Sequence, residues 1–379
     1  MYIYQQENRY FAQIADGMEQ LGVEELHELG AQEMKTAYRG IYFVTDRNGL
    51  YRINYMSRLL TKIYAAIRIF SCHSDKYLYR NALAIDWKEF FSVNNTFAVT
   101  ATVSHSKIKH SKFAALRLKD AIVDYFRKHF GKRPDVDTTI PDIRIDLHIE
   151  NNRAVISIDT SGGSLHRRGY RKVSVDAPMQ ETVAAAIIRL SDWDGSQPLY
   201  DPMCGSGTLL CEAFMQYCRI PAGIHRDKFG FEYLPDFDKA LWKTVKTDAG
   251  NYMREIPLGI ISGSDISREA VNAAKLNLGR LPHGGSVCVK VTDFQKISSL
   301  ENSIIVCNPP YGIRMGEKEN IGEFYHEFGE FLKHKCKGSN AFIYFGDRSL
   351  IKHFALRASW KKPLKNGGLD GQLAKFELY

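Results

Sequence analysis

Four polar residues in the C-terminal half of the sequence each follow a short run that is long enough for one strand. They are Asp201, Asp265, Asp293 and Asn308. The runs alternate with helical patterns, and this alternation predicts a doubly wound, mostly parallel sheet. Because the carboxyl ends of parallel strands meet at one edge, where open α/β sheets bind ligands, we expect the four side chains to line one ligand site.

The residues from 308 to 311, Asn308-Pro309-Pro310-Tyr311, predict a rigid turn at the last of these strand ends. Each proline fixes its own φ and disfavours the helical conformation in the residue before it. Such a turn can hold the amide oxygen of Asn308 and the carbonyl of Pro309 close together, beside the ring of Tyr311. Two acceptors and an aromatic face suit the exocyclic amine of a flat base. Taken alone, the motif fits a rigid turn without chemistry equally well.

The segment from Leu199 to Thr208 predicts a strand, a tight turn and a helix. Gly205 and Gly207 allow the backbone to approach a ligand closely. The nicotinamide-dinucleotide pattern requires a third glycine three residues later, but Leu210 occupies that position. A carboxylate at Asp201 instead fits a cofactor with an amino-acid end, because it can accept a hydrogen bond from an ammonium group.

The other two acids suit the nucleoside part of such a cofactor. Asp265 can accept hydrogen bonds from both ribose hydroxyls, although an aspartate before a helix is also a good N-cap. Asp293 can accept from an adenine amine, with Phe294 beside the ring. The long separation of Asp201 from Asp265 predicts an insertion between Pro221 and Ile256.

The composition predicts a globular protein of two or three domains in a reducing compartment. The chain has 379 residues, 44% hydrophobic content and a net charge of +8, which permits a nucleic-acid partner. Its seven cysteines include no C-x-x-C pair, so we expect buried thiols and neither zinc nor disulfides. No run approaches the roughly 18 apolar residues of a membrane span, and the N-terminus lacks a signal pattern. These features predict a cytoplasmic protein without a membrane partner.

Two basic clusters are candidate RNA-binding sites. Lys107, Lys109 and Lys112 precede a predicted helix, and Arg167, Arg168 and Arg171 lie in a segment rich in Gly and Ser. Both could contact phosphates. The competing interpretation is a solvated helix face and a linker.

The pattern of elements divides the chain into four parts. Residues 1–60 and 61–160 predict two small α+β units, residues 161–176 a linker, and residues 177–379 a domain of alternating strands and helices. We expect strands in this last domain at 198–200, 259–262, 287–291, 304–307 and 341–345. Helices are expected at 177–190, 208–219, 268–281, 324–335 and 348–355, followed by a hairpin within 360–379.

The motifs DPMCGSG, GSDI, TDF and NPPYG resemble, in order, those of class I S-adenosylmethionine-dependent methyltransferases that act on exocyclic amines. The N-terminal part is similar to a ferredoxin-like subdomain (1–60) and a THUMP RNA-binding domain (61–160), supported by AIDWKEFFSVNNTFAV, KFAALRLKDAIVDYFRKHFGKRPDVD, PDIRIDLHI and SLHRRGYR. The combination most resembles the bacterial THUMP guanine-N2 methyltransferases of 23S ribosomal RNA. Some of these carry a second methyltransferase domain, and this chain ends at Tyr379, so the resemblance covers only the guanine-N2 half or a single-domain relative.

The resemblance implies a Rossmann-like methyltransferase domain with S-adenosylmethionine as cofactor. Its RNA partner would be large-subunit ribosomal RNA or an assembly intermediate of it. Catalytic roles are implied for Asn308, Pro309, Pro310 and Tyr311. Cofactor contacts are implied for Pro178, Asp201, Met203, Gly205, Gly207, Thr208, Asp265, Ile266, Asp293 and Phe294.

Three alternatives remain open at this point. The same motifs serve a guanine-N2 methyltransferase of transfer RNA and an adenine-N6 methyltransferase of nucleic acid. A non-catalytic RNA-binding assembly factor could keep the same fold. The motif NPPY does not distinguish guanine from adenine.

Overall fold

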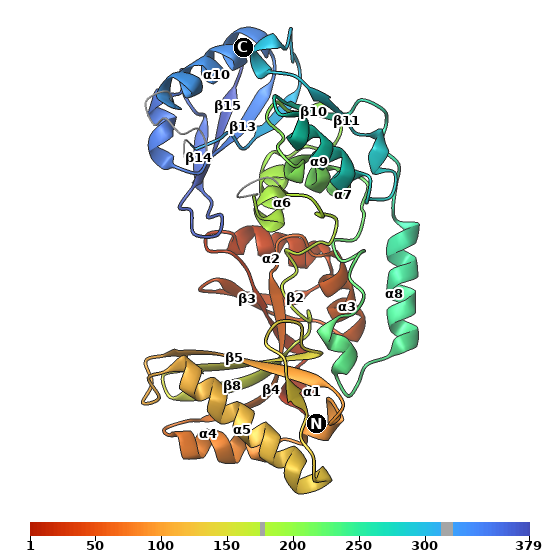
Figure 1. Cartoon of the computed structure of the whole chain (residues 1–379), viewed down its shortest axis with the longest axis vertical. Coiled ribbons are helices and arrows are strands. Elements are labelled where there is room, and N and C mark those ends of the chain that lie inside the picture. Colours follow the sequence, from red (N-terminus) through yellow and green to blue (C-terminus); the bar gives the residue numbers. More distant parts are fainter. Residues whose placement is uncertain (175–178, 312–320) are drawn as a thin grey trace. The chain divides into compact units, whose positions relative to one another are not determined.

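The computed structural model describes residues 1–174, 179–311 and 321–379 (Figure 1). These residues form two compact units. Unit 1 holds residues 1–14, 22–165 and 226–246, and unit 2 holds residues 15–21, 166–225 and 247–379.

Unit 1 is built on one mixed sheet of eight strands in the order β2-β3-β1-β4-β8-β7-β5-β6. β5 runs parallel to β6 and β7, and the other neighbouring pairs are antiparallel. Because β4 pairs with both β1 and β8, the residues expected for the ferredoxin-like and THUMP domains share a continuous sheet. The strands are β1 (Arg9–Gln13), β2 (Gln32–Ala37), β3 (Gly40–Val44), β4 (Lys62–Ser71), β5 (Thr96–Ser104), β6 (Asp135–Val136), β7 (Ile143–Glu150) and β8 (Arg153–Asp159).

Alternation of apolar and polar residues decides which face of this sheet is buried. In β7, Ile143, Ile145, Leu147 and Ile149 are buried, and the residues between them are more exposed. α5 packs on β5 and α4, and it ends at Gly131, whose left-handed φ of 66° suits a residue without Cβ. The helices in this part of the chain are α1 (Ile3–Glu7), α2 (Glu19–Glu28), α3 (Arg47–Met56), α4 (Asp75–Leu83), the 3₁₀ helix η1 (Trp87–Glu89) and α5 (Ser111–Phe130).

Most of the expected insertion belongs to unit 1. It contains the 3₁₀ helix η2 (Gly230–Tyr233) and α8 (Lys239–Asn251). Phe231 stacks on Tyr51 of α3 with ring centroids 4.5 Å apart, and Trp242 meets Tyr55 edge-on at 5.2 Å. Aromatic packing of this kind stabilises the fold beyond simple burial. The insertion therefore completes the core of a unit that lies earlier in the sequence.

Unit 2 contains a seven-stranded sheet in the order β11-β10-β9-β12-β13-β15-β14. The first five strands in this order are parallel, and β15 and β14 add an antiparallel hairpin. The order reverses between β9 and β12, which places the topological switch point of the sheet there. The strands are β9 (Leu199–Asp201), β10 (Ile261–Asp265), β11 (Cys288–Val291), β12 (Ile304–Cys307), β13 (Asn340–Phe345), β14 (Trp360–Pro363) and β15 (Gln372–Glu377).

Helices of unit 2 form two groups around this sheet (Figure 1). α6 packs against α7, and α7 against α9, whereas α10 buries Tyr325, Phe328 and Leu332 in a cluster with Ile305 and Ile343 of the sheet. The helices are α6 (Glu181–Leu190), α7 (Thr208–Tyr217), α9 (Arg268–Leu278), α10 (Ile321–Lys335) and the short 3₁₀ helices η3 (Gly284–Ser286), η4 (Phe294–Lys296) and η5 (Arg348–His353). The α/β fold expected from the sequence is confirmed.

Some element boundaries differ from the sequence expectations. The strand expected at 259–262 instead spans Ile261–Asp265. The helix expected at 177–190 begins at Glu181 within the described residues, and the one at 348–355 is the 3₁₀ helix η5. Asp347 caps η5 by accepting from the backbone N–H of Ser349, so this helix is a short capped turn.

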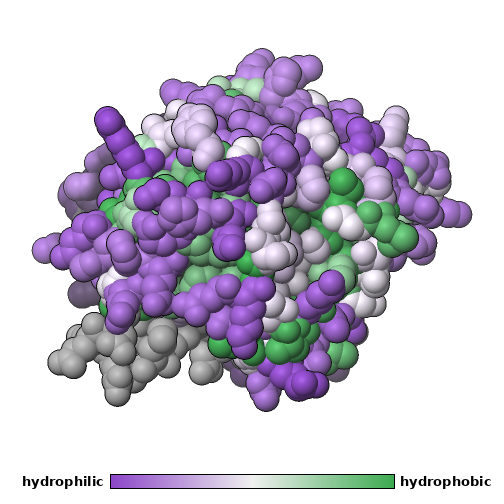
Figure 2. All heavy atoms as spheres, turned by 90° about the horizontal axis from the view of Figure 1, so that it is seen from above, coloured by the Kyte–Doolittle hydropathy of each residue, from purple (hydrophilic) through white to green (hydrophobic). Residues whose placement is uncertain are grey.

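The surface that faces the viewer when the molecule is seen from the top of Figure 1 is mainly hydrophilic (Figure 2). Hydrophobic residues lie there in several separate areas among hydrophilic ones (Figure 2). Among the helices of the described residues, none combines the length and apolar character needed to cross a membrane.

Candidate active site

A cavity of about 480 Å³ lies in unit 2 at the carboxyl ends of β9, β10, β11 and β12. It therefore occupies the switch-point region where open α/β sheets bind ligands. Of the predicted cofactor residues, eight line it: Asp201, Met203, Gly205, Thr208, Asp265, Ile266, Asp293 and Phe294. Gly207 sits in the same loop, between the lining residues Ser206 and Thr208, and Pro178 lies outside the described residues. Of the predicted catalytic residues, Asn308 and Pro310 line the cavity.

The glycine loop between β9 and α7 is held by backbone contacts that only small residues allow. Gly205 and Gly207 have φ values of 53° and 79°, in the left-handed region. A Cβ on Gly207 would lie 3.0 Å from the Cβ of Ala274, so α9 packs directly against the loop. The N–H of Gly205 donates to Asp265 Oδ2 at 2.9 Å. Asp265 thus fixes the loop at the end of the neighbouring strand.

Asp201 is a buried carboxyl beside the cavity. Asp201 is only 1% exposed, and its Oδ1 accepts a hydrogen bond from the backbone N–H of Met203 at 3.1 Å. Burial raises the pKa of Asp201 well above its usual value, although the Met203 N–H acts in the opposite direction, and the Asp265 carboxylate raises it further. A ligand ammonium group in the cavity would offset the cost of ionising this carboxyl.

The sequence left two roles open for Asp265: capping the following helix, or binding ribose hydroxyls. Ser267 is the N-cap of α9 and accepts from the N–H of Ala270 at 3.2 Å. Asp265 instead accepts from Gly205 and, through Oδ1, from the N–H of Ser267 at 2.9 Å. Each carboxylate oxygen retains capacity for a further hydrogen bond, so Asp265 remains able to contact ribose hydroxyls. Beside it, Ile266 is 71% exposed and lines the cavity.

The wall at the end of β11 is fixed by aromatic packing. Asp293 caps η4, with Oδ1 accepting from the N–H of Gln295 at 3.1 Å. Phe294 is buried against Phe324 and Phe328, with ring centroids 5.8 Å and 5.3 Å away. Gln295 and Phe324 also line the cavity. Neither residue was predicted from the sequence. Phe324 belongs to α10, and no local sequence pattern indicates that a residue of this helix lines the cavity.

Two tyrosine hydroxyls contact the segment from Asn308 to Tyr311. The hydroxyl of Tyr311 donates to Asn308 Oδ1, and the hydroxyl of Tyr325 donates to the carbonyl of Pro310 at 3.2 Å. An amide oxygen has two lone pairs, so Asn308 can still accept a second hydrogen bond. Pro309 is buried, and Gly312 lies outside the described residues. The stacking role of Tyr311 stays a prediction.

The residues around the cavity fit S-adenosylmethionine, the cofactor that the sequence resemblance implies. The buried Asp201 carboxyl has no ion pair among the described residues and can receive the ammonium group. Asp265 can receive the ribose hydroxyls, and Asp293 with Ile266 and Phe294 can receive the adenine. When bound, this cofactor supplies a methyl group activated by its sulfonium.

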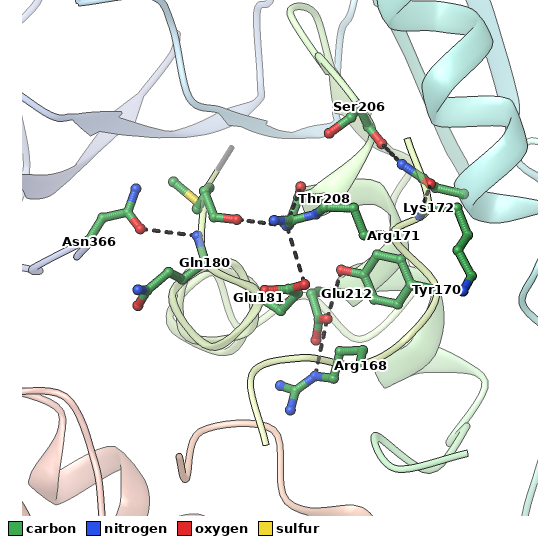
Figure 3. Close-up of polar contacts among 12 residues, drawn as sticks. Arg168, Tyr170, Arg171, Lys172, Gln180, Glu181, Ser206, Thr208, Glu212 and Asn366 are labelled. Atoms are coloured by element: carbon green, nitrogen blue, oxygen red, sulfur yellow. Dashed lines mark hydrogen bonds and ion pairs between the residues drawn. The ribbon is translucent and has the colours of Figure 1, made fainter. Parts of the chain in front are cut away.

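The predicted RNA-binding residues divide into exposed and buried groups. Lys107, Lys109 and Lys112 are exposed around the N-terminus of α5, and Arg167 is exposed in unit 2. The prediction that Arg168 contacts RNA is wrong, because its side chain is 0% exposed and pairs with Glu212 at 3.4 Å. Arg171 is likewise directed into unit 2, where it contacts Thr208 (Figure 3).

Comparisons with known proteins agree with this architecture. The chain matches the family described as RMKL-like, methyltransferase domain, over residues 168–375. It also matches the THUMP domain over residues 72–159 and the RlmL ferredoxin-like domain over residues 9–64. Part of the segment expected to be a linker thus falls within the methyltransferase match.

Relatives and solved structures cover nearly the whole chain. A Synechocystis protein named "Putative RNA methyltransferase" is 40% identical and covers 98% of this chain and 97% of its own length. The ribosomal RNA large subunit methyltransferase K/L of Photobacterium profundum is 36% identical over 96% of this chain, which spans 52% of that protein. A crystal structure described as "a possible methylase from Clostridium difficile" superposes with a TM-score of 0.86 and 28% identity, covering 98% of both chains.

A second crystal structure, described as "a putative methyltransferase complexed with SAH", is 29% identical, has a TM-score of 0.85 and covers 98% of both chains. The full-length matches, the THUMP domain and the cavity at the four strand ends agree with one another. The chain belongs to the family of THUMP-containing, RMKL-like RNA methyltransferases, which use S-adenosylmethionine.

Proposed function

We propose that this protein methylates the exocyclic N2 amine of a guanine in 23S ribosomal RNA. The observation that carries the proposal is the position of Asn308 and Pro310 on the same cavity as Asp201 and Asp265. A cofactor held by the aspartates would have its methyl group near the turn that accepts the amine. The choice of ribosomal RNA is supported by the name of the K/L relatives, about half of whose length this chain spans.

The turn would act mainly by orienting the amine. Asn308 Oδ1 and the carbonyl of Pro309 accept its two N–H groups, which directs the nitrogen lone pair towards the methyl group. The hydroxyl of Tyr311 donates to the same amide oxygen and holds the Asn308 amide in one orientation. No strong general base is required, because the methylated amine becomes acidic and loses its proton to water.

The target base must leave its stack to reach this cavity. A base in a duplex is extruded at a cost of a few kcal/mol, and a single-stranded base is available at lower cost. We propose that Tyr311 provides the aromatic surface for the extruded base, beside Tyr344, whose ring centroid is 6.3 Å away. The exposed lysines at the start of α5 would add affinity through phosphates without selecting a sequence.

The experiment is a methylation assay with the purified protein, labelled S-adenosylmethionine and 23S RNA from cells that lack the gene. Nucleoside digestion and mass spectrometry should identify N2-methylguanosine. Asn308→Ala should reduce the rate at least a hundredfold, as expected when an orienting interaction is lost, and should keep SAH affinity within threefold. Asn251→Ala, at an exposed position at the end of α8, is the matched control and should be fully active.

Two results would overturn the proposal. Formation of N6-methyladenosine instead of N2-methylguanosine would assign the other amine to the same turn. Wild-type methyl transfer by Asn308→Ala would remove the orienting role of the amide, whatever the base.

A further inference from the structure

The segment that leads from unit 1 into α6 is fastened inside unit 2. We call residues 166–174 the connecting segment. Two of its side chains, Arg168 and Tyr170, meet at Glu212 of α7, with the Tyr170 hydroxyl donating to Glu212 Oε1 at 3.0 Å (Figure 3). All three residues are buried. Arg168, which the sequence places in a basic cluster, is therefore an interior part of the methyltransferase domain.

Arg171 links two walls of the cofactor cavity. Its Nη2 donates to the carbonyl of Met179 at 2.7 Å and to Thr208 Oγ1 at 3.0 Å. Met179 precedes α6, Thr208 begins α7, and both line the cavity. The same Nη2 lies 3.6 Å from Glu181 Oε1, and the Arg171 side chain is 15% exposed. Figure 3 shows Arg171 between these groups.

Asn277 makes a second link between the connecting segment and the glycine loop. Its Oδ1 accepts from the N–H groups of Lys172 and Val173 at 3.0 Å and 3.3 Å. Its Nδ2 donates to the carbonyls of Val173 and Ser206 at 2.8 Å and 3.0 Å. Asn277 is fully buried, so each of these bonds would be costly to lose. Asn277 thus connects the loop from 205 to 208 to the connecting segment.

We propose that Arg171 is a positioning residue for the cofactor: by binding Met179 and Thr208 together, it holds the cavity wall in the shape that binds S-adenosylmethionine. It acts through these two residues and does not line the cavity itself. The proposal rests on cofactor use by the family and is independent of which base is methylated. It also gives SLHRRGYR a role in the methyltransferase domain in place of RNA contact.

The geometry explains why arginine suits this position better than lysine. The two N–H groups of Nη2 serve the Met179 carbonyl and the Thr208 hydroxyl, with the Glu181 carboxylate 3.6 Å away, and the planar guanidinium fixes the directions of both N–H groups. Lysine would keep the positive charge beside Glu181 but would lose this fixed arrangement. A purely structural role would lower stability and leave cofactor affinity unchanged, so the two roles predict different measurements.

The test compares SAH binding by calorimetry in the full-length protein carrying Arg171→Met, Arg171→Lys or the control Arg167→Met. Arg167 is an exposed arginine in the same segment. Arg171→Met should weaken SAH binding at least tenfold, and Arg171→Lys should weaken it less. RNA affinity should stay within twofold in both. Arg167→Met should bind SAH as wild type does.

A double-mutant cycle tests whether the effect passes through the cavity wall. Thr208→Val removes the hydroxyl that Arg171 contacts and keeps the side-chain shape. If Arg171 acts through Thr208, the effects of Arg171→Lys and Thr208→Val on SAH affinity should be non-additive. Additive effects, or wild-type SAH affinity in Arg171→Met, would overturn the proposal. If Arg171→Met does not fold, wild-type affinity in both Arg171→Lys and Thr208→Val would overturn it.

Discussion

Replacing Asp201 by asparagine separates the stability of the empty protein from its affinity for the cofactor. Asparagine has nearly the same shape, and its amide oxygen can keep the bond from the Met203 N–H. What the variant loses is the carboxylate charge at a residue 1% exposed. We therefore expect opposite effects on the two quantities.

The effect on stability follows from the raised pKa of Asp201. Burial raises the pKa of this carboxyl above its value of about 4 in the unfolded chain, so folding favours the protonated acid. The contribution of Asp201 to stability is fully present below about pH 4 and is lost as the pH rises through the folded-state pKa. Asp201→Asn should therefore match the wild type at low pH and be at least as stable near pH 8.

The effect on affinity comes from the lost partner of the cofactor's ammonium group. A hydrogen bond to a charged group contributes about 1.5–3 kcal/mol. Each 1.4 kcal/mol is about a factor of ten, so SAH should bind about 10- to 150-fold more weakly to Asp201→Asn. Calorimetry with SAH measures the affinity, and urea denaturation of the empty protein from about pH 4 to pH 8 measures stability.

Asp248→Asn is the matched control, because Asp248 is exposed on α8. It should leave both the affinity and the pH dependence unchanged. Wild-type SAH affinity in Asp201→Asn would refute the ammonium-binding role. A large loss of stability in the empty variant at pH 8 would refute the argument from burial.

Two further variants test the glycine loop and the basic surface. Gly207→Ala should lower the free energy of unfolding, measured by urea denaturation, by about 1–2 kcal/mol for the left-handed φ alone. The loss should be larger because the new Cβ would lie 3.0 Å from Ala274 Cβ. Gly285→Ala, in open space, should not lower the free energy of unfolding, and equal effects of the two variants would contradict the packing argument. Replacing Lys107, Lys109 and Lys112 by glutamine should weaken RNA binding and reduce the slope of log affinity against log salt by about 2–3, whereas an unchanged slope would remove these lysines from the RNA interface.

The sequence was most informative where local pattern and chemistry coincide. Short apolar runs followed by Asp201, Asp265, Asp293 and Asn308 predicted the strand ends that now line one cavity. The glycines between β9 and α7 identified the tight loop, since their left-handed φ values are what glycine allows most easily. These features depend on neighbouring residues and can be recognised without knowing the fold.

Two elements of unit 1, β2 and α3, were harder to predict because their local patterns are weak. β2, with the sequence QEMKTA, is an edge strand without a buried alternating face, so its apolar pattern is weak. α3 contains Gly49 near its start, where a Cβ would lie 1.8 Å from Thr45 Oγ1, and glycine there weakens the helical pattern. Asp46 compensates by capping the helix through the N–H of Gly49 at 2.7 Å.

Charge alone could not separate buried from exposed arginines. Arg167 and Arg168 are adjacent in the sequence, yet only Arg168 meets a carboxylate, that of Glu212 on α7. A buried charge needs a partner, and that partner is distant in the sequence. For the same reason, the sequence did not indicate that Met179 and Phe324, which lie in other elements, line the cavity.

Nucleoside analysis of 23S RNA can show directly whether this protein methylates guanine N2, in cells that lack the gene and carry either the wild-type or the Asn308→Ala protein. We expect N2-methylguanosine at one position to be lost without the gene, restored by the wild type and still absent with Asn308→Ala. Unchanged N2-methylguanosine in cells without the gene, or full restoration by Asn308→Ala, would contradict it.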